Sequence, residues 1–394
     1  MTPSNPPVRP PRILHCVSHL ALGGAERVAL AIIRELQRDF EFSVFAVRGV
    51  ADGDVGVALK KQLGAQSIPV HLGPRIPMRR GGIVSGALSL ARALERFKPD
   101  LLHLHTEIPE ASCAALLAID PRYRSIPVVR TIHNSVIWQF APQLGRACDR
   151  LLAHSNIAGV SQDAVTAFNV LRSGSGAPGP SLAVETIFNG VDLIEARPPY
   201  PPSSDMIRIV YGGRLEPEKG TDLLPEILAL TQLPTGRRAH LTIFGSGSHE
   251  ARLRSLAKQP PAGWTVDVLG PVPDFAERLA EFDVALLPSR YEGLALVAIE
   301  ALRAGIQVVA SDASGLREAL PPHHPWVART GDAASFAAAL QFALLNRSRW
   351  PAIAEAGRSF SLGFSPKAMA LGYRTFYQRV LAKTAGERAR TSVI

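Results

Sequence analysis

Two glutamates, Glu292 and Glu300, stand on either side of a predicted helix start in the second half of the chain. The apolar run 283–287 predicts a buried parallel strand before them, and the residues after Gly293 stay helix-compatible until Gly305, which would end the helix. At 1.5 Å per residue the carboxylates lie roughly 12 Å apart, too far for the acid and base of a glycosidase. The spacing suits two hydroxyl clusters of one long ligand, with the helix N-terminus free to hold an anion. A capping charge and a solvated helix face would explain the same residues without a ligand.

A pair of cations, Arg214 and Lys219, forms the second group with possible chemistry. Their glycine-flanked loop, 212–220, follows a strand predicted over 207–211 and precedes a helix expected from Asp222. Arginine supplies a two-pronged fork for phosphate and lysine a point charge. The pair fits a diphosphate, although a solvated loop with two cations is the simpler interpretation when the loop is taken alone.

The first half opens with a glycine turn. Gly23 and Gly24 lie between a strand predicted over 12–18 and a helix with apolar residues from Val28 onward. Strand, glycine turn and helix is the arrangement by which doubly wound folds bring the backbone close to phosphate. The G-x-G-x-x-G fingerprint is missing from this turn, so dinucleotide binding is not indicated.

Two predicted strands of the first half end in a histidine. His105 closes 100–105, with Glu107 just beyond it, and His133 closes 127–133. Ligands of α/β folds bind at such carboxyl ends, so these side chains predict a site. A structural histidine at a strand end is the alternative.

The elements that position these residues belong to two successive α/β domains, because 394 residues exceed what one core usually organises. The predicted boundaries are a first domain over 1–194, a proline-rich linker over 195–205, a second domain over 206–365 and a last helix over 366–394. The remaining strands are expected at 42–47, 67–70, 157–161 and 184–188 in the first domain and at 241–245, 266–270 and 307–310 in the second.

Composition and charge narrow the class of protein. Hydrophobic residues make up 46% and charged residues 20% of the chain, as in ordinary globular proteins, and no apolar run is long enough to span a membrane. The N-terminus lacks the apolar core of a signal peptide, and the three cysteines have neither disulfide-like nor zinc-like spacing. The net charge of +9 is spread over both halves without any nucleic-acid motif. We therefore expect a cytoplasmic enzyme with no nucleic-acid partner.

Taken in order, the motifs resemble those of the retaining GT-B glycosyltransferases of family GT4. The matching segments are the Gly23-Gly24 turn, the stretch 189–192 (NGVD), the loop 213–220, Glu292-x7-Glu300 and the segment 310–318. The resemblance spans nearly the whole chain. It implies two Rossmann-like, doubly wound domains facing a central cleft, the first for the acceptor and the second for a nucleotide sugar, with the last helix crossing back to the first domain.

The resemblance also implies roles for single residues. Arg214 and Lys219 would bind the diphosphate, Glu300 the ribose and Glu292 the sugar hydroxyls, with His133 beside the reaction centre. The expected catalytic group is therefore His133, Arg214, Lys219 and Glu292, and His105 and Glu107 are expected on the acceptor side. The wider donor-binding set adds Gly23, Gly24, Gly213, Gly270, Gly293, Leu294, Ala295 and Leu296.

The implied activity is transfer of a hexose or N-acetylhexosamine from a UDP-sugar or GDP-sugar to a hydroxyl of a lipid-linked or saccharide acceptor, in bacterial cell-surface polysaccharide or glycolipid synthesis. No cofactor and no metal are expected, because neither a D-x-D motif nor a histidine cluster accompanies the phosphate site. The charge of the leaving phosphate would then fall on Arg214, Lys219 and the helix N-terminus. Retaining members of the family are thought to let the leaving phosphate accept the proton of the acceptor.

Two segments depart from the family pattern. The family commonly reads Glu-Gly-Phe-Gly where this chain has Leu294 and Ala295 in the last two places, and Gln307 replaces a proline. Ala295 adds a methyl group where backbone amides should approach the ligand, so the shape of the sugar pocket, and hence the sugar, stays open.

A basic cluster, Arg75, Arg79 and Arg80, precedes a helix predicted from Ile83. The apolar stripe of that helix consists of Ile83, Ala87, Leu90, Leu94 and Phe97. Such a pairing can lie against an anionic membrane, which would place the first domain at the inner face of the cytoplasmic membrane. The alternative is a surface helix whose stripe packs into the core.

Three other functions compete with sugar transfer. A sugar-nucleotide epimerase shares the GT-B architecture but would not be expected to match the Glu-x7-Glu helix. An NAD enzyme would need a third glycine that the stretch 245–250 lacks. A catalytically degenerate GT-B binding module is disfavoured because both glutamates and both cations are present.

Overall fold

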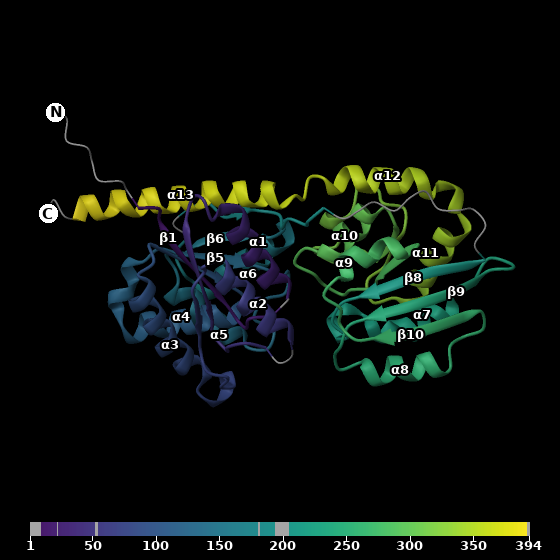
Figure 1. Cartoon of the computed structure of the whole chain (residues 1–394), viewed down its shortest axis with the longest axis horizontal. Helices are drawn as coiled ribbons and strands as arrows, with labels where there is room; N and C mark the ends of the chain where they lie inside the picture. The colour runs from purple at the N-terminus through teal and green to yellow at the C-terminus, as the bar shows by residue number, and fades with distance from the viewer. Residues whose placement is uncertain (1–8, 22, 52–53, 180–181, 194–204, 392–394) are drawn as a thin grey trace. The chain divides into compact units, whose positions relative to one another are not determined.

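The computed structural model describes residues 9–21, 23–51, 54–179, 182–193 and 205–391, and the chain divides into two compact units. Unit 1 comprises Met1–Gly190 with Pro366–Ile394, and unit 2 comprises Val191–Ser365 (Figure 1). Among the described helices, none is long and apolar enough to cross a membrane. The predicted linker 195–205 falls outside the described residues except for its last position.

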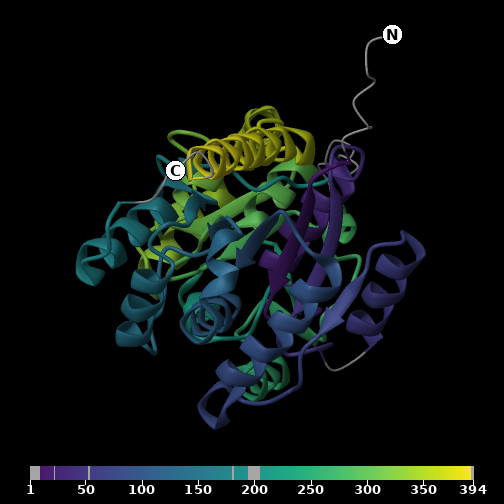
Figure 2. The same cartoon turned by 90° about the vertical axis from the view of Figure 1, so that its left-hand side faces the viewer.

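Unit 1 is built on a parallel sheet with helices on both faces (Figures 1 and 2). Its described residues give seven strands in the order β3-β2-β1-β4-β5-β6-β7. The strands are β1 (Arg12–Val17), β2 (Glu41–Ala46), β3 (Val70–Leu72), β4 (Leu101–His105), β5 (Val128–Ile132), β6 (Asn156–Gly159) and β7 (Glu185–Thr186). The helices are α1 (Gly24–Leu36), α2 (Asp54–Ala65), α3 (Gly82–Phe97), α4 (Glu107–Ile119), α5 (Pro142–Leu151), α6 (Gln162–Ser175) and α13 (Pro366–Thr391).

Alternation along the strands sorts the side chains of unit 1 into two cores. Ile13 and Val17 of β1 face a core shared with α1, α2 and α13. Leu14 and Cys16 face the other core, which α3, α4 and α5 cover. Because successive side chains of a strand point to opposite faces, His15 lies on the α13 side.

Helix α13 packs on the sheet of unit 1 beside α1 (Figure 2). Its Tyr377 hydroxyl is hydrogen-bonded to His103 Nδ1 at 2.6 Å, and its Tyr373 hydroxyl to Thr131 Oγ1 at 2.9 Å. All four side chains are buried. A buried polar group that loses its partner costs about 1–3 kcal/mol, so these bonds specify where α13 lies over β4 and β5.

Unit 2 repeats the architecture with a six-stranded parallel sheet in its described residues, in the order β10-β9-β8-β11-β12-β13. The strands are β8 (Met206–Gly212), β9 (Arg238–Phe244), β10 (Trp264–Leu269), β11 (Val284–Leu287), β12 (Gln307–Ser311) and β13 (Val327–Ala328). The helices are α7 (Leu224–Leu230), α8 (Glu250–Lys258), α9 (Phe275–Arg278), α10 (Leu296–Ala304), α11 (Ala333–Leu345) and α12 (Trp350–Ser361).

Arg303, on α10, ties together the two ends of unit 2. Its buried guanidinium donates to the backbone carbonyl oxygens of Val191 and Asp192 at the beginning of the unit and of Ser361 and Phe364 at its end. The last two residues of the NGVD stretch therefore close unit 2, which gives this motif a structural function.

Two short strands differ from the sequence prediction. The strand expected at 67–70 begins only at Val70, because Ser67 has a left-handed φ of 58° in the turn after α2. Strand β13, with two residues, was not predicted, because its run is too short to show a periodicity.

Candidate active site

The strand order of unit 2 creates a switch point between β8 and β11. These strands are neighbours, but the chain continues from β8 towards β9 and from β11 towards β12, on opposite sides. The connections therefore diverge and leave a crevice at the carboxyl ends of the two strands, where doubly wound folds bind their ligands. The loops at this point carry Lys219 and Glu292.

Lys219 and Glu292 form a two-pronged ion pair across the switch point. The Lys219 Nζ atom lies 2.7 Å from Glu292 Oε1 and 2.8 Å from Oε2, and Ser289 Oγ donates to the same carboxylate at 2.7 Å. The side chains are 23% and 14% exposed, respectively. The resemblance assigned the two residues to the phosphate and to the sugar hydroxyls; the structure shows them bonded to each other.

Glycines let the backbones of these loops approach closely enough for the pair to form. Gly220 has a φ of +65°, and a Cβ there would lie 1.9 Å from the carbonyl oxygen of Pro288. Gly315, after β12, has a φ of +68°, and a Cβ there would lie 2.5 Å from the carbonyl oxygen of Glu292. Both positions require glycine, for the backbone conformation and for the space.

A second ion pair joins the same two loops. Arg290 Nη1 and Nη2 lie 2.7 and 2.8 Å from the carboxylate oxygens of Asp222, and the Arg290 backbone N–H donates to the carbonyl oxygen of Glu218 at 2.8 Å. These side chains are 32% and 25% exposed. The pair resembles Lys219–Glu292 in type and location, so breaking it is a matched control for breaking the Lys219–Glu292 pair.

Arg214, the other predicted phosphate ligand, has a different environment. Its side chain is 68% exposed and pairs with Glu218 at 2.9 Å. The loop beneath it is held by the buried Tyr211, whose hydroxyl donates to the Arg214 carbonyl oxygen at 2.8 Å. Burial, and then the nearby Glu292 charge, raise the pKa of Tyr211, which keeps this donor protonated. Gly213, with a φ of +153°, precedes it.

The remaining predicted donor residues divide into two groups. Gly293, Leu294 and Ala295 are buried in the turn before α10, Leu296 begins that helix, and Glu300 is fully buried within it. Gly270, by contrast, follows β10 and is exposed. The structure does not bring Gly270 to the switch point, because β9 separates β10 from β8.

Unit 1 has its own switch point, between β1 and β4. The two loops meet where Ser18 Oγ and Thr106 Oγ1 are hydrogen-bonded at 2.7 Å. Thr106 has a φ of 72°, which is strained for a β-branched residue, and such strain gathers at functional sites. Glu107 begins α4, and its carboxylate accepts a hydrogen bond from the Trp138 backbone N–H. Burial raises the pKa of Glu107.

The glycine turn lies at the same switch point. Gly23 caps α1, and a Cβ on it would come within 2.3 Å of Glu26 Oε2. Gly24 is exposed with open space around it. Burial raises the pKa of Glu26. A carboxyl group therefore packs against the turn where the sequence predicted an approach to phosphate.

Three histidines form a row that ends at the carboxyl edge of the sheet. His133 Nε2 lies 2.9 Å from His105 Nδ1, and His105 Nε2 lies 2.9 Å from His15 Nδ1. Burial lowers the pKa of His15 and of His133 to about 3 and that of His105 well below its usual range. His105 is fully buried with both ring nitrogens engaged. It therefore lies behind His133 with no ring nitrogen left for a ligand, while its place on the acceptor side stays a prediction.

The sequence prediction missed His15 and His103 as members of this group. His103 packs against both neighbours, with ring centroids 4.7 Å from His15 and 4.0 Å from His105. Within the described residues, His15, His103 and His105 also form a cluster close enough to hold a metal ion. The available signal was alternation: two histidines two positions apart on one apolar strand share a face, but nothing local shows that β1 lies beside β4.

Each half of the chain matches a model of a known protein family. The family model described as Glycosyltransferase Family 4 matches residues 22–159, and the model described as Glycosyl transferases group 1 matches residues 194–360. The chain belongs to the GT4-type glycosyltransferases. The GT4 matches take in the loop after β4 in unit 1 and both loops of the Lys219–Glu292 pair in unit 2.

The relatives of this GT4 chain include enzymes with different products. It is 27% identical over 291 residues to the sulfoquinovosyl transferase SQD2 of Arabidopsis thaliana, covering 66% of this chain and 51% of that protein. It is 31% identical over 238 residues to a glycogen synthase of Mycobacterium tuberculosis, covering 57% of this chain and 55% of that one. The chain thus spans about half the length of the curated relatives it matches.

Solved structures agree on the fold of the GT4 chain. HepE of Anabaena, crystallised in complex with UDP and glucose, matches with a TM-score of 0.74 at 21% identity, covering 93% of this chain and 99% of HepE. The fold is GT-B, with two Rossmann-like parallel-sheet domains.

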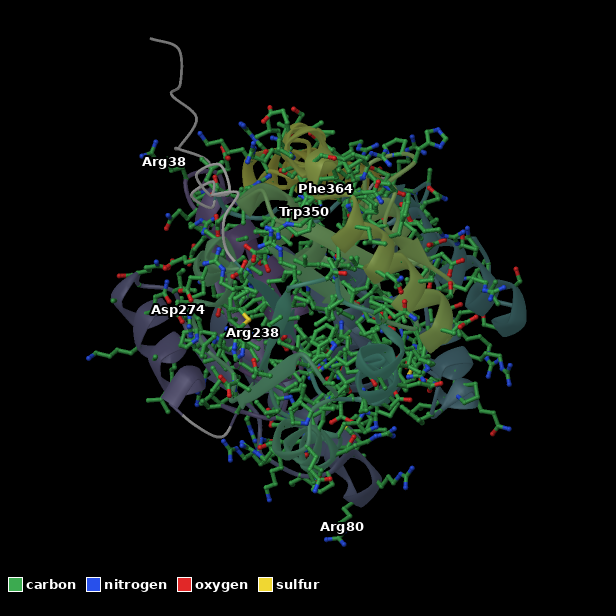
Figure 3. The ribbon with its side chains drawn as sticks, turned by 90° about the vertical axis from the view of Figure 1, so that its right-hand side faces the viewer. Arg38, Arg80, Arg238, Asp274, Trp350 and Phe364 are labelled. Atoms are coloured by element: carbon green, nitrogen blue, oxygen red, sulfur yellow. The ribbon has the colours of Figure 1, made fainter. Side chains whose placement is uncertain are left out.

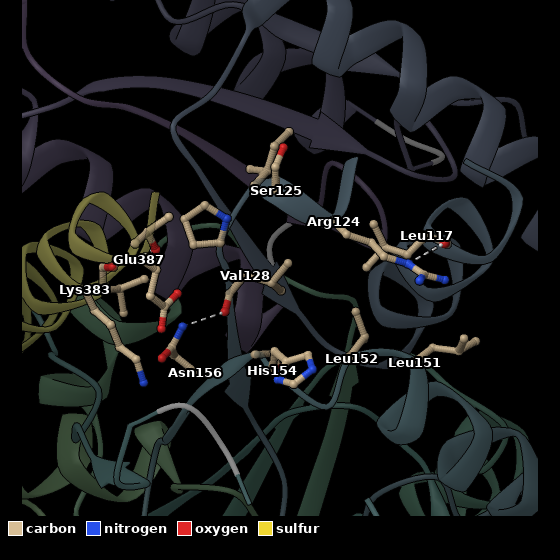
Figure 4. A pocket seen from close by; sticks show the side chains of 15 residues that line it. Leu117, Arg124, Ser125, Val128, Leu151, Leu152, His154, Asn156, Lys383 and Glu387 are labelled. Carbon is tan, nitrogen blue, oxygen red and sulfur yellow. Dashed lines mark hydrogen bonds between the residues drawn. The ribbon is translucent and has the colours of Figure 1, made fainter. Parts of the chain in front are cut away.

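A pocket of about 590 Å³ in unit 1 lies away from these residues (Figure 4). Val128 and Asn156, the first residues of β5 and β6, line it together with Lys383 of α13. Asn156 Nδ2 donates to the Val128 carbonyl oxygen at 3.3 Å. The pocket is therefore at the amino edge of the sheet, whereas His133 follows the carboxyl end of β5, the edge at which α/β folds bind ligands.

Proposed function

We propose that this GT4 chain is a retaining glycosyltransferase that moves a hexose or N-acetylhexosamine from a nucleotide sugar to an acceptor hydroxyl, without a metal ion. The observation that carries the proposal is the Lys219–Glu292 ion pair at the switch point of unit 2. An ammonium group for phosphate and a carboxylate for hydroxyls lie together there, just before the N-terminus of α10. A sugar diphosphate carries both kinds of group, a phosphate for the ammonium and hydroxyls for the carboxylate.

The proposed roles follow from charge and position. Lys219 and the exposed Arg214 neutralise the leaving diphosphate, Glu292 holds hydroxyls of the donor sugar and Glu300 the ribose. His133 is the proposed group of unit 1 at the reaction centre, and Glu107 is proposed on the acceptor side. The leaving phosphate accepts the proton of the acceptor hydroxyl, so no carboxylate nucleophile is needed. Metal independence is proposed because no D-x-D motif occurs in the half of the sequence that carries the phosphate site.

The relatives support a nucleotide sugar and leave the transferred group open. HepE was crystallised with UDP and glucose, so UDP-glucose is the first donor to test, with GDP-sugars beside it. The curated relatives transfer sulfoquinovose or build glycogen, and a lipid-linked or saccharide acceptor is proposed accordingly.

A thermal-shift panel of UDP- and GDP-sugars tests the donor. A ligand present at a hundred times its Kd stabilises the folded state by about 2.7 kcal/mol, which we expect for one nucleotide sugar and not for NAD. With that donor, transfer to an acceptor should proceed equally in EDTA. Isomerisation of the donor without transfer would favour an epimerase, and binding without turnover would favour a binding module. Loss of activity in EDTA, restored by Mg²⁺, would contradict metal independence.

Membrane contact is proposed through α3, on a smaller surface than the sequence predicted. Ala87, Leu90, Leu94 and Phe97 of the predicted stripe are buried in the core, as in the alternative interpretation. The exposed apolar residues of α3 are instead Val84, at 52%, and Leu88, at 49%, one helical turn apart.

Two of the predicted arginines lie just before this surface. Arg79 and Arg80 are exposed in the short 3-10 turn that precedes α3, and the Arg80 side chain points away from the ribbon (Figure 3). Arg75, in contrast, donates to the Val50 carbonyl oxygen. The proposed surface therefore consists of Arg79, Arg80, Val84 and Leu88.

Flotation with anionic vesicles tests this surface. At about 1 kcal/mol for each basic residue near an anionic membrane, changing Arg79 and Arg80 to glutamine should weaken binding about 30-fold. Added salt should weaken binding of the unchanged protein as well. The exposed Arg38, on another part of unit 1, serves as the control for lost charge. Absence of binding to anionic vesicles at low salt, or an equal loss with Arg38→Gln, would refute the contact and favour a soluble acceptor.

A further inference from the structure

The row of histidines in unit 1 forms a continuous hydrogen-bonded chain with distinct ends. One end is His133, just after β5 and partly exposed. The other is the Nε2 atom of His15, which is buried and has no hydrogen-bond partner among the described residues. His105 stands between them with both ring nitrogens engaged, each at 2.9 Å. The chain therefore connects the carboxyl edge of the sheet to its interior.

Neutral imidazoles leave only two proton arrangements for this chain. Each ring carries one N–H and one bare nitrogen, and every hydrogen bond needs one of each. All protons must therefore point towards His15 or all must point towards His133. A charged ring would break this rule, but burial lowers the pKa of all three rings far below neutral pH.

The buried end selects one of the two arrangements. If the protons point towards His15, its Nε2 carries an N–H that no described residue accepts. If they point towards His133, that Nε2 is a bare lone pair. Orphaned buried N–H groups are rarer in proteins than underused acceptors, so the second arrangement is favoured. It places a proton on His15 Nδ1 and on His105 Nδ1, and leaves His133 Nε2 to accept.

We propose that His15 and His105 are positioning residues that hold the proton of His133 on Nδ1, so that His133 presents an N–H donor, and not a base, to the substrate. No described residue bonds to this Nδ1 atom in the structure. Such a donor can stabilise negative charge that develops on an oxygen of the substrate. It leaves removal of the acceptor proton to another group, as the proposed function, on which this inference rests, requires.

A metal site is the competing explanation for the cluster of His15, His103 and His105, and the distances disfavour it. Two nitrogens bound to one tetrahedral zinc at 2.0–2.1 Å lie about 3.3 Å apart. The His15–His105 separation of 2.9 Å is shorter and has the length of a hydrogen bond. His103 also has both ring nitrogens engaged, by Tyr377 and by Thr131 at 2.7 Å.

The direct test is ¹⁵N NMR of the histidine rings in the full chain, because protonated and bare ring nitrogens have well-separated shifts. His133 is assigned by the signals lost in His133→Asn. We expect His133 with a protonated Nδ1 and a bare Nε2. A proton on Nε2 would overturn the inference, as would one Zn²⁺ binding tightly and shifting the signals of His15, His103 and His105. This measurement needs no turnover, so it remains decisive even if the proposed transferase activity fails.

Two replacements of His105 supply the second readout. Asparagine places an amide near the ring Nδ1 position and can still donate to His133, whereas glutamine reaches the Nε2 position and can only keep the bond to His15. We expect His105→Asn to retain the Nδ1–H form and most of kcat. His105→Gln should lose that form and lower kcat by about 10–100-fold, as when the partner that orients a functional histidine is removed, with little change in donor KM. Equal kcat for both variants, or a loss confined to KM, would refute the positioning role.

Discussion

Replacing Lys219 with methionine is expected to lower kcat/KM by about 10²–10³-fold while leaving unit 2 folded. In the proposed reaction, negative charge grows on the leaving phosphate in the transition state, and Lys219 is the cation held at the switch point by both oxygens of Glu292. The side chains of the ion pair are 23% and 14% exposed, so its loss should cost more stability than that of an exposed pair, but less than the about 3–5 kcal/mol of a fully buried one. Steady-state kinetics with the best donor, together with urea denaturation, measures both quantities.

A variant that breaks the Arg290–Asp222 pair distinguishes two possible roles of Lys219, binding the phosphate and holding the two loops together. Arg290→Met breaks a two-pronged pair between the same two loops, at a similar cost in stability. It should leave kcat/KM within a few-fold of the unchanged enzyme. If Arg290→Met and Lys219→Met are equally slow, Lys219 acts only by holding the loops together, and the phosphate assignment fails.

Glu292→Gln extends the same test to a double-mutant cycle. Because Lys219 and Glu292 are bonded to each other, their losses should not add in the double variant. Additive losses would show that the two side chains act on the substrate independently.

Lowering the pH from 7 to 5 is expected to remove much of the stability of unit 1 and less of that of unit 2, where burial lowers the pKa of His324. Burial lowers the pKa of His15 and of His133 to about 3 and keeps the pKa of His103 and His105 well below the usual value near 6.5. Between pH 6.5 and about 3, the unfolded chain therefore binds protons that the folded chain excludes. The free energy of unfolding falls with falling pH by about 1.4 kcal/mol per pH unit for each histidine. Four such groups would exhaust a typical total of about 5–15 kcal/mol within a few pH units.

Hydrogen exchange at pH 7.0 and 5.5, corrected for the intrinsic rate, measures this loss separately in the two units. Protection of β1, β4 and α13 should collapse at the lower pH, and peptides from β8 and β11 serve as the internal reference. His15→Leu should reduce the pH slope by about 1.4 kcal/mol per unit, whatever its effect at pH 7. If the free energy of unfolding of unit 1 does not change with pH, the histidine rings are hydrated in the folded protein and the prediction is wrong.

Much of the framework of this chain could be predicted locally. Apolar runs marked nearly all the strands, and Gly305, with a φ of +75°, ends α10 where the sequence placed a stop. These features depend on neighbouring residues: a strand shows its period, and only glycine readily adopts that turn. For the same reason, the loops that carry Lys219 and Glu292 were located correctly between their strands and helices.

What the side chains in those loops contact was decided by the tertiary structure alone. Lys219 and Glu292 are 73 positions apart, His15 and His105 are 90 apart, and His103 and Tyr377 are 274 apart. They meet because β8 lies beside β11, because β1 lies beside β4, and because α13 packs over β4. Periodicity shows which face a residue takes, but the order of strands in a sheet depends on the packing of the whole unit. The sequence therefore identified the cations and carboxylates, while the ion pair and the histidine chain required the folded sheets.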